Sequence, residues 1–178
     1  MKVLLLNSGG KDSLGAAMAL KYHELHSVYL DAGWPCREAA LVAAESLAGR
    51  YCATHSVLSI ALPMVEVLPG HQTVAYQAQV LHLIGAALAC GRGYAAVASG
   101  QWTDAAMPSF PDDLDRMLAS NKLFRPVQFL MPLWALTIEE IETLVKQDPL
   151  WRETVYCNCA VPCGECVKCR KRKAWLDR

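Results

Sequence analysis

A short glycine-rich stretch near the start of the chain decides how its first elements can fold. It reads Ser8-Gly9-Gly10-Lys11-Asp12-Ser13, follows an apolar run at residues 3–6 and precedes a helix-compatible run at residues 14–20. Adjacent glycines let the backbone approach a ligand closely, and the N-terminus of the following helix favours negative charge. We therefore expect a strand-to-helix turn that binds a phosphate or a pyrophosphate.

The side chains of this stretch suit the same ligand. Lys11 supplies a cation, Ser8 and Ser13 supply hydroxyl donors, and the Asp12 carboxylate could hold Mg²⁺ between phosphate oxygens. The spacing is neither the Walker G-x-x-x-x-G-K-[ST] nor the dinucleotide-binding G-x-G-x-x-G. The alternative interpretation is an ordinary strand-to-helix turn capped by serine and aspartate.

Strands and helices are expected to alternate after this turn. Residues 27–31 and 55–60 have strand patterns, and residues 38–50 between them form an Ala- and Leu-rich helical segment. This order within about 60 residues predicts right-handed crossovers and a parallel sheet with ligands at the carboxyl ends of its strands. The expected class is an α/β protein with a Rossmann-like parallel sheet.

The rest of the chain continues this pattern with one exception. Residues 63–72 carry two prolines and a glycine and are expected to form a loop, a candidate substrate lid. Thr137 and Glu140 form a capping box that starts a helix with an apolar stripe for the core. The other expected elements are a helix at 73–90, a buried strand at 94–100, an irregular acidic loop at 101–113, a helix at 115–123 and an edge strand at 129–133.

Length and charge limit the classes of protein to be considered. The chain has 178 residues with 17 basic and 17 acidic side chains, so no global field draws it to nucleic acid or to an anionic membrane. The first apolar run is too short for a secretory signal, and no run approaches the length of a membrane span. We expect a cytoplasmic protein with an ATP-binding α/β domain at 1–150 and a small C-terminal zinc-binding segment at 151–178. The oligomeric state stays open between monomer and homodimer.

Five of the eight cysteines crowd into the C-terminal segment. Cys163, Cys166 and Cys169 form C-x-x-C-x-x-C, and either Cys157 or Cys159 can supply a fourth thiolate from a preceding turn. Four thiolates at this spacing suit a closed, tetrahedral structural Zn²⁺ site. Alternatives are an iron–sulfur cluster or disulfides, and the basic run at 170–173 is interpreted as charge compensation for the site, with a nucleic-acid patch as its alternative.

The other cysteines and most histidines are expected to be structural. Cys36, Cys52 and Cys90 lie in apolar surroundings. His23, His26 and His82 are placed on helix surfaces or ends, whereas His71 falls in the expected lid and is the histidine with a candidate functional position.

Taken together, these motifs resemble those of the 7-cyano-7-deazaguanine synthase family of PP-loop ATP pyrophosphatases. The likeness rests on S-G-G-x-D-S, on Gly100 followed by Asp104, on Ser109-Phe110-Pro111-Asp112, and on Val155-Tyr156-Cys157 ahead of the C-G-x-C-x-x-C run. It implies an adenine nucleotide alpha-hydrolase-like fold. It also implies a carbon–nitrogen ligase that uses ATP, Mg²⁺ and ammonia to convert 7-carboxy-7-deazaguanine into the nitrile for queuosine and related deazaguanines.

The resemblance also assigns roles to residues of this chain. Lys11, Asp12 and Asp104 would be catalytic, and the whole 8–13 stretch would bind ATP. Zinc would be held by Cys157, Cys163, Cys166 and Cys169, with Cys157 chosen over Cys159 by the alignment. The acceptor, a small molecule, would bind beneath the lid through Gln101, Trp102, Asp104, Phe110 and Asp112; the alternative places Phe110 in the core and Asp112 at a solvated helix start.

Two features typical of the family have no counterpart here. They are an Arg-Asn pair ahead of the long helix, near Gln72, and a Tyr-Gly-Gln after the second strand, where this chain has Asp31-Ala32-Gly33. The alternative functions are therefore a sibling PP-loop enzyme that adenylates another carboxylate or thiolates a tRNA base, and a zinc-bearing nucleotide-binding module without catalysis.

Overall fold

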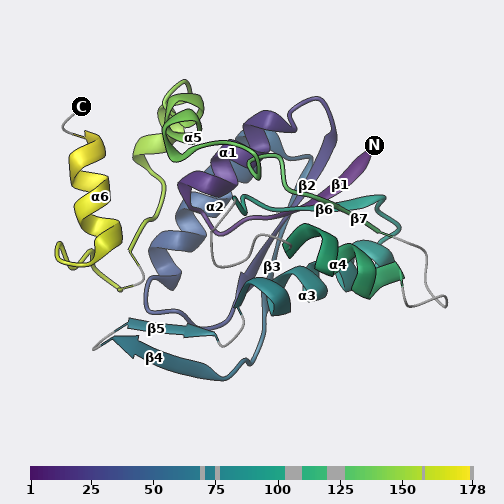
Figure 1. The fold of residues 1–178 in the computed structure, drawn as a ribbon, viewed down its shortest axis with the longest axis horizontal. Coiled ribbons are helices and arrows are strands. Elements are labelled where there is room, and N and C mark those ends of the chain that lie inside the picture. Colours follow the sequence, from purple (N-terminus) through teal and green to yellow (C-terminus); the bar gives the residue numbers. More distant parts are fainter. Residues whose placement is uncertain (69–70, 75–76, 103–109, 120–126, 158, 177–178) are drawn as a thin grey trace.

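The centre of the molecule is a five-stranded sheet in which every neighbouring pair of strands is parallel. The structure, a computed structural model, describes residues 1–68, 71–74, 77–102, 110–119, 127–157 and 159–176. The strand order is β3-β2-β1-β6-β7 (Figure 1). The expected α/β class with a parallel sheet is confirmed. The strands are β1 (Lys2–Leu6), β2 (Glu24–Asp31), β3 (Thr54–Ser59), β6 (Ala96–Ala98) and β7 (Gln128–Leu130).

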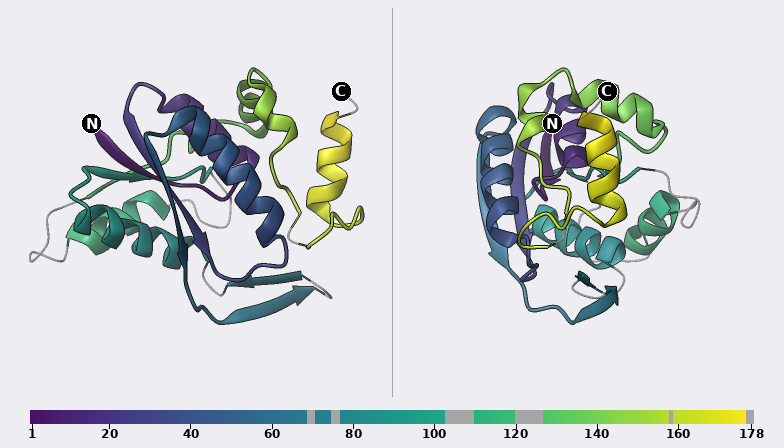
Figure 2. Two further views of the ribbon diagram at one scale, coloured as in Figure 1. Left: turned by 180° about the vertical axis from the view of Figure 1, so that it is seen from behind. Right: turned by 90° about the vertical axis from the view of Figure 1, so that its left-hand side faces the viewer.

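Helices cover both faces of this sheet. Helices α1 and α2 lie on one face and α3 and α4 on the other, while α6 stands beyond the carboxyl end of β1 (Figures 1 and 2). The helices are α1 (Lys11–Ala19), α2 (Arg37–Tyr51), α3 (Gln77–Gly91), α4 (Phe110–Ala119), α5 (Ile138–Val145) and α6 (Val167–Leu176), with a 3₁₀ turn η1 (Pro149–Arg152).

The alternation of side chains along β1 divides the core into two clusters. Val3 and Leu5 pack with residues of α1 and α5, whereas Leu4 packs with residues of α3 and α4. Because successive side chains of a strand point to opposite faces, a strand buried on both sides is apolar at every position. This explains the uninterrupted apolar run at residues 3–6.

The segment expected to be a loop at 63–72 is instead part of a two-stranded antiparallel sheet, so that prediction was wrong. Strand β4 (Met64–Leu68) pairs with β5 (His71–Val74), with Met64 opposite Val74. The Pro69-Gly70 dipeptide separates the two strands in the sequence, and such a pair marks a turn between strands as readily as a loop. Because β5 extends to Val74, α3 starts at Gln77 and not at residue 73.

Later elements follow the predictions more closely. Strand β7 lies at the edge of the sheet, as its neighbouring proline required, and the Thr137 capping box is present with both reciprocal hydrogen bonds. Helix α4 begins at Phe110, five residues before the expected start at 115, and residues 120–123 of the predicted segment lie outside the described part. Of the predicted apolar stripe, Ile141 and Val145 are fully buried.

The C-terminal segment returns to the main sheet through two contacts. Trp151 and Trp175 belong to the core cluster on the α1 side. Val155 forms a parallel bridge with Gly10, and its N–H donates to the Gly9 carbonyl at 2.9 Å. The segment therefore lies directly against the glycine-rich turn, while the division of the chain at residue 150 stays a prediction.

No helix in the described part of the chain is long and apolar enough to cross a membrane.

Candidate functional site

A cleft of about 780 Å³ opens where the carboxyl ends of β1, β2 and β6 meet. One wall is the glycine-rich turn, and the others come from the end of β2, the start of α3, the chain after β6 and the C-terminal segment. Sites at this edge are expected for an open parallel sheet, because its strands all end there. Residues 8–13, except Gly9, line the cleft directly.

Hydrogen bonds and close packing hold the turn in one conformation. The Ser8 N–H donates to Ser13 Oγ at 3.0 Å, and the Gly9 N–H donates to Asn7 Oδ1 at 3.0 Å. Gly9 has φ +71°, and a Cβ built there would lie 2.5 Å from the Ala40 carbonyl oxygen. Only glycine meets both constraints, so the first glycine of the stretch is required by the fold itself.

The amino end of α1 faces the cleft, and its first backbone N–H groups are free of helical hydrogen bonds. Its first helical hydrogen bond runs from the Leu14 N–H to the Gly10 carbonyl at 3.1 Å, and no side chain caps Gly10. The N–H groups before Leu14 therefore have no partner within the helix, and together with the helix dipole they form a site for an anion. The expected strand-to-helix turn is confirmed, while its phosphate ligand stays a prediction.

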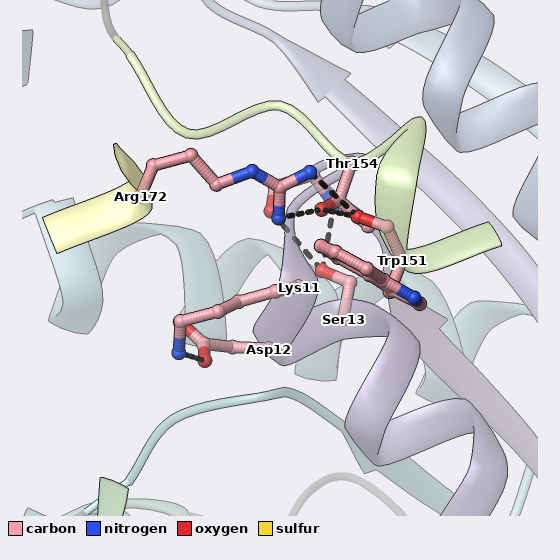
Figure 3. Close-up of polar contacts among 7 residues, drawn as sticks. Lys11, Asp12, Ser13, Trp151, Thr154 and Arg172 are labelled. Atoms are coloured by element: carbon pink, nitrogen blue, oxygen red, sulfur yellow. Dashed lines mark hydrogen bonds and ion pairs between the residues drawn. The ribbon is translucent and has the colours of Figure 1, made fainter. Parts of the chain in front are cut away.

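Lys11 and Asp12 form an ion pair at the mouth of this turn. Lys11 Nζ lies 2.5 Å from Asp12 Oδ1 (Figure 3), and the two side chains are 28% and 37% exposed. An ion pair this exposed contributes little to stability. Both groups can consequently turn to a ligand, the ammonium to phosphate oxygens and the carboxylate to Mg²⁺.

His82 is a site residue that the sequence analysis missed, since it lies inside the protein and not on a helix surface. It lines the cleft, is 5% exposed, and contacts the Ala78 carbonyl oxygen through Nδ1 at 2.6 Å and Ser99 Oγ through Nε2 at 2.7 Å. Burial lowers the pKa of His82, so the ring is neutral, donates to Ala78 and accepts from Ser99. The sequence did contain one signal for this position: His82 is a polar residue in an otherwise apolar part of α3.

The residues expected to bind the acceptor divide into three groups. Gln101 and Trp102 line the cleft. Phe110 is 4% exposed and packs in the core against His82 and Trp134, as the alternative interpretation held, and Asp112 is exposed in the first turn of α4. Asp104 lies outside the residues that the structure describes.

The four predicted cysteine ligands come together next to the cleft. The sulfur atoms of Cys157, Cys163, Cys166 and Cys169 all lie within 4.8 Å of one another. Cys163 Sγ lies 3.9 Å from Cys157 Sγ and 3.8 Å from Cys169 Sγ. A tetrahedral zinc with Zn–S bonds of about 2.3 Å requires S···S distances of about 3.8 Å, so the cluster has the dimensions of such a site.

The protonation of these thiols also suits a metal ion. A hydrogen bond from the Cys166 N–H, with a second from Glu165, lowers the pKa of Cys163 to about 6. Burial, followed by the neighbouring sulfur atoms, raises the pKa of Cys169 to about 12. Four thiolates can therefore stand together only beside a cation that stabilises their negative charge, and a Cys₄ group of this kind can hold Zn²⁺.

We expect the purified protein to contain about one zinc ion per chain, and chelation to destabilise the C-terminal segment. Binding energy at a structural zinc is largely folding energy, so removal of the metal should expose the amides of α6. Metal analysis and amide hydrogen exchange with and without chelator measure both effects. Absence of zinc, or an iron–sulfur absorbance band, would contradict this prediction.

The comparisons with known proteins bear on the fold alone. No protein-family model matches this sequence, and no curated protein sequence matches it. Among the solved structures that match is the crystal structure of a predicted subunit of tRNA methyltransferase from Methanocaldococcus jannaschii, with a TM-score of 0.54. That chain is 21% identical, and the match covers 82% of this chain and 76% of the other. At this identity the likeness shows a shared fold.

Proposed function

We propose that this protein is a PP-loop enzyme that uses ATP to activate an acceptor by adenylation. The observation that carries the proposal is the turn at residues 8–13, held rigid at the carboxyl end of a parallel sheet with the bare amino end of α1 facing a cleft. Such a turn suits the pyrophosphate part of ATP. A leaving pyrophosphate gathers negative charge, and fixed N–H groups stabilise that charge without reorganising.

The cleft supplies groups for the departure of pyrophosphate in the proposed reaction. An acceptor oxygen attacks the α-phosphorus, the bond between the α- and β-phosphates breaks, and pyrophosphate leaves toward the turn. The N–H groups of α1 and Lys11 hold the leaving group, and Asp12 would hold Mg²⁺, which neutralises phosphate charge when bound. A nucleophile then displaces AMP from the adenylated acceptor.

For the acceptor we propose 7-carboxy-7-deazaguanine, by the resemblance of the motifs. Ammonia would displace AMP to give the amide, and a second adenylation on the amide oxygen would let AMP carry that oxygen away and leave the nitrile. Trp102 offers a flat apolar surface at the cleft and Gln101 a side-chain amide, which suit a planar bicycle with polar edges. Asp104 keeps its proposed catalytic role, and Phe110 and Asp112 would act from outside the cleft, by packing and by charge.

A second candidate is adenylation of a tRNA base by the same cleft. Three cationic residues of α6, Lys168, Lys171 and Arg172, line the cleft, and the protein of similar fold described above is a predicted subunit of tRNA methyltransferase. Phosphate contacts from lysine and arginine are the usual source of RNA affinity. Both candidates belong to a nucleotide-modifying enzyme that consumes ATP.

We expect turnover to release AMP and pyrophosphate, because the proposed role of the turn is to hold the β- and γ-phosphates as the leaving group. Wild-type protein would be incubated with ATP, Mg²⁺, ammonia and either 7-carboxy-7-deazaguanine or unmodified tRNA, with products resolved by chromatography and mass spectrometry. Nitrile formation supports the first acceptor, and an altered tRNA nucleoside supports the second.

Two outcomes would contradict the proposal. Release of ADP in the presence of an acceptor would exclude adenylation. Absence of turnover with every acceptor, from zinc-loaded protein that binds ATP, would favour a nucleotide-binding module without catalysis.

A further inference from the structure

Arg172 is a buried cation in the wall of the cleft. It comes from the middle of α6, is 6% exposed, and lines the same cleft as Lys11 and Asp12. Figure 3 shows its guanidinium on the side of the cleft above the amino end of α1. Arginine keeps its charge at any physiological pH, although burial lowers the pKa of Arg172. A full positive charge is therefore held permanently at this wall.

The surroundings of Arg172 hold it in place without neutralising it. Its guanidinium lies 4.7 to 5.2 Å from the ring centres of Trp151, Tyr156 and Trp175, and it donates to the Trp151 carbonyl at 2.8 Å and the Arg152 carbonyl at 3.2 Å. Among the residues that the structure describes, no carboxylate lies within 4 Å of it. Its buried Nε has no hydrogen-bond partner there either.

Such an arrangement needs an explanation, because a buried charge is costly. Aromatic faces and carbonyl oxygens offset only part of the desolvation, and a carboxylate partner would offset more. A cation kept rigid and unpaired beside a cleft is what a site for an anionic ligand requires, since the ligand then supplies the missing counter-charge.

Most of the other charged side chains that line the cleft are also cations. Four of its charged lining residues are cations and two are acids, namely Lys11, Lys168, Lys171 and Arg172 against Asp12 and Glu142. The neutral His82 adds nothing to this balance. A cleft with an excess of positive charge concentrates anions.

The position of Arg172 relative to the glycine-rich turn narrows the choice of anion. Thr154 accepts a weak hydrogen bond from Arg172 at 3.4 Å, and the next residue, Val155, is bridged to Gly10. The guanidinium is thus tied, through two adjacent residues, to the backbone of the turn itself. It lies beside the place where a leaving pyrophosphate would be held.

We propose that Arg172 and Lys171 form a second anion-binding element of the cleft and bind the pyrophosphate part of the nucleotide together with the amino end of α1. This rests on the proposed function and extends it, since the sequence analysis gave the basic run at 170–173 only charge compensation at the cysteine site or, as the alternative, a nucleic-acid patch. In this proposal the C-terminal segment contributes directly to nucleotide binding. Cys169 of the cysteine cluster lies on α6 with Arg172, so a metal there would hold the helix that presents this cation.

The test is a calorimetric titration in which inorganic pyrophosphate and Mg²⁺ are added to zinc-loaded protein. Pyrophosphate affinity is measured for wild type and for three variants. Arg172→Gln should bind pyrophosphate about 10- to 100-fold more weakly, because a charge-assisted hydrogen bond is lost. Lys171→Gln should bind about 3- to 10-fold more weakly. Lys173→Gln is the matched control: it removes the same charge from the same helix at an exposed position outside the cleft.

The salt dependence of pyrophosphate affinity distinguishes direct binding by these cations from an indirect effect through the packing of α6. Pyrophosphate affinity of wild type should fall more steeply with salt than that of Lys171→Gln, an exposed position whose loss leaves the packing of α6 intact. The inference is overturned if Lys171→Gln and a folded, zinc-loaded Arg172→Gln both bind pyrophosphate like Lys173→Gln. It is equally overturned if wild type binds no pyrophosphate. It stands if binding depends on these residues while no acceptor yields AMP, and then the proposed reaction fails instead.

Discussion

Asp12→Asn is expected to slow AMP formation by about 100-fold or more while the protein stays folded. A metal ion that bridges phosphate oxygens stabilises the transition state by several kcal/mol, and an amide is a much weaker ligand than a carboxylate. The fold should survive, because Asp12 makes only a part-exposed ion pair with Lys11. Single-turnover assays with saturating ATP and acceptor, together with thermal unfolding, measure the two effects.

Asp113→Asn is the matched control for this experiment. Asp113 is an exposed carboxylate on α4 that pairs with Arg116, and it lies outside the cleft. The same replacement of a carboxylate by an amide at position 113 should leave the rate of AMP formation unchanged. If Asp12→Asn retained more than a third of wild-type activity, metal-assisted chemistry at this carboxylate would have to be abandoned.

Gly100→Ala is expected to disrupt the proposed nucleotide site although it adds a single methyl group. A Cβ at Gly100 would lie 2.2 Å from both the carbonyl carbon and the oxygen of Asp12, and 2.8 Å from the Ser13 nitrogen. These are backbone atoms, which cannot rotate away as a flexible side chain can, so the turn must move. Overpacking of this kind costs about 1–3 kcal/mol of stability, and a shift of about 1 Å at the turn can slow catalysis about 100-fold.

Gly49→Ala serves as the control for this substitution. Gly49 lies near the end of α2, and nothing lies within 4 Å of a Cβ placed there. Alanine in a helix is favoured over glycine by about 1 kcal/mol, so this variant should be as stable as wild type or more so. Thermal unfolding and ATP titration of both variants test the pair. If Gly100→Ala bound ATP with the affinity of wild type, the conformation of the glycine-rich turn would not depend on its packing against the chain after β6.

Local patterns in the sequence were sufficient for the elements around the glycine-rich turn. The apolar run of β1, the two glycines and the capping box at Thr137 each act through neighbouring backbone, so their effects can be deduced from a few adjacent residues. The same holds for the cysteine cluster, because a C-x-x-C-x-x-C spacing brings three sulfurs together through one turn and the first turn of α6. The choice of Cys157 needed the alignment with the family motif.

Long-range packing decided what those patterns left out. The 63–72 segment has turn residues that suit a loop as well as a hairpin, and only pairing across it distinguishes the two. The sequence around Phe110 suits either a ring that stacks on a ligand or a core residue. The packing of α4 against α3 places Phe110 in the core.

By itself, then, the sequence determined the α/β alternation, the glycine turn between β1 and α1 and the cluster of four cysteines, because each depends on residues close together in the chain. The tertiary structure decided which distant residues share the cleft. His82 meets Ser99 across 17 positions, and Arg172 meets Trp151 across 21, to form walls that no local pattern indicates. The reason is that burial and the balance of charge in a cleft depend on every element packed around it, and those elements come together only when the sheet is complete.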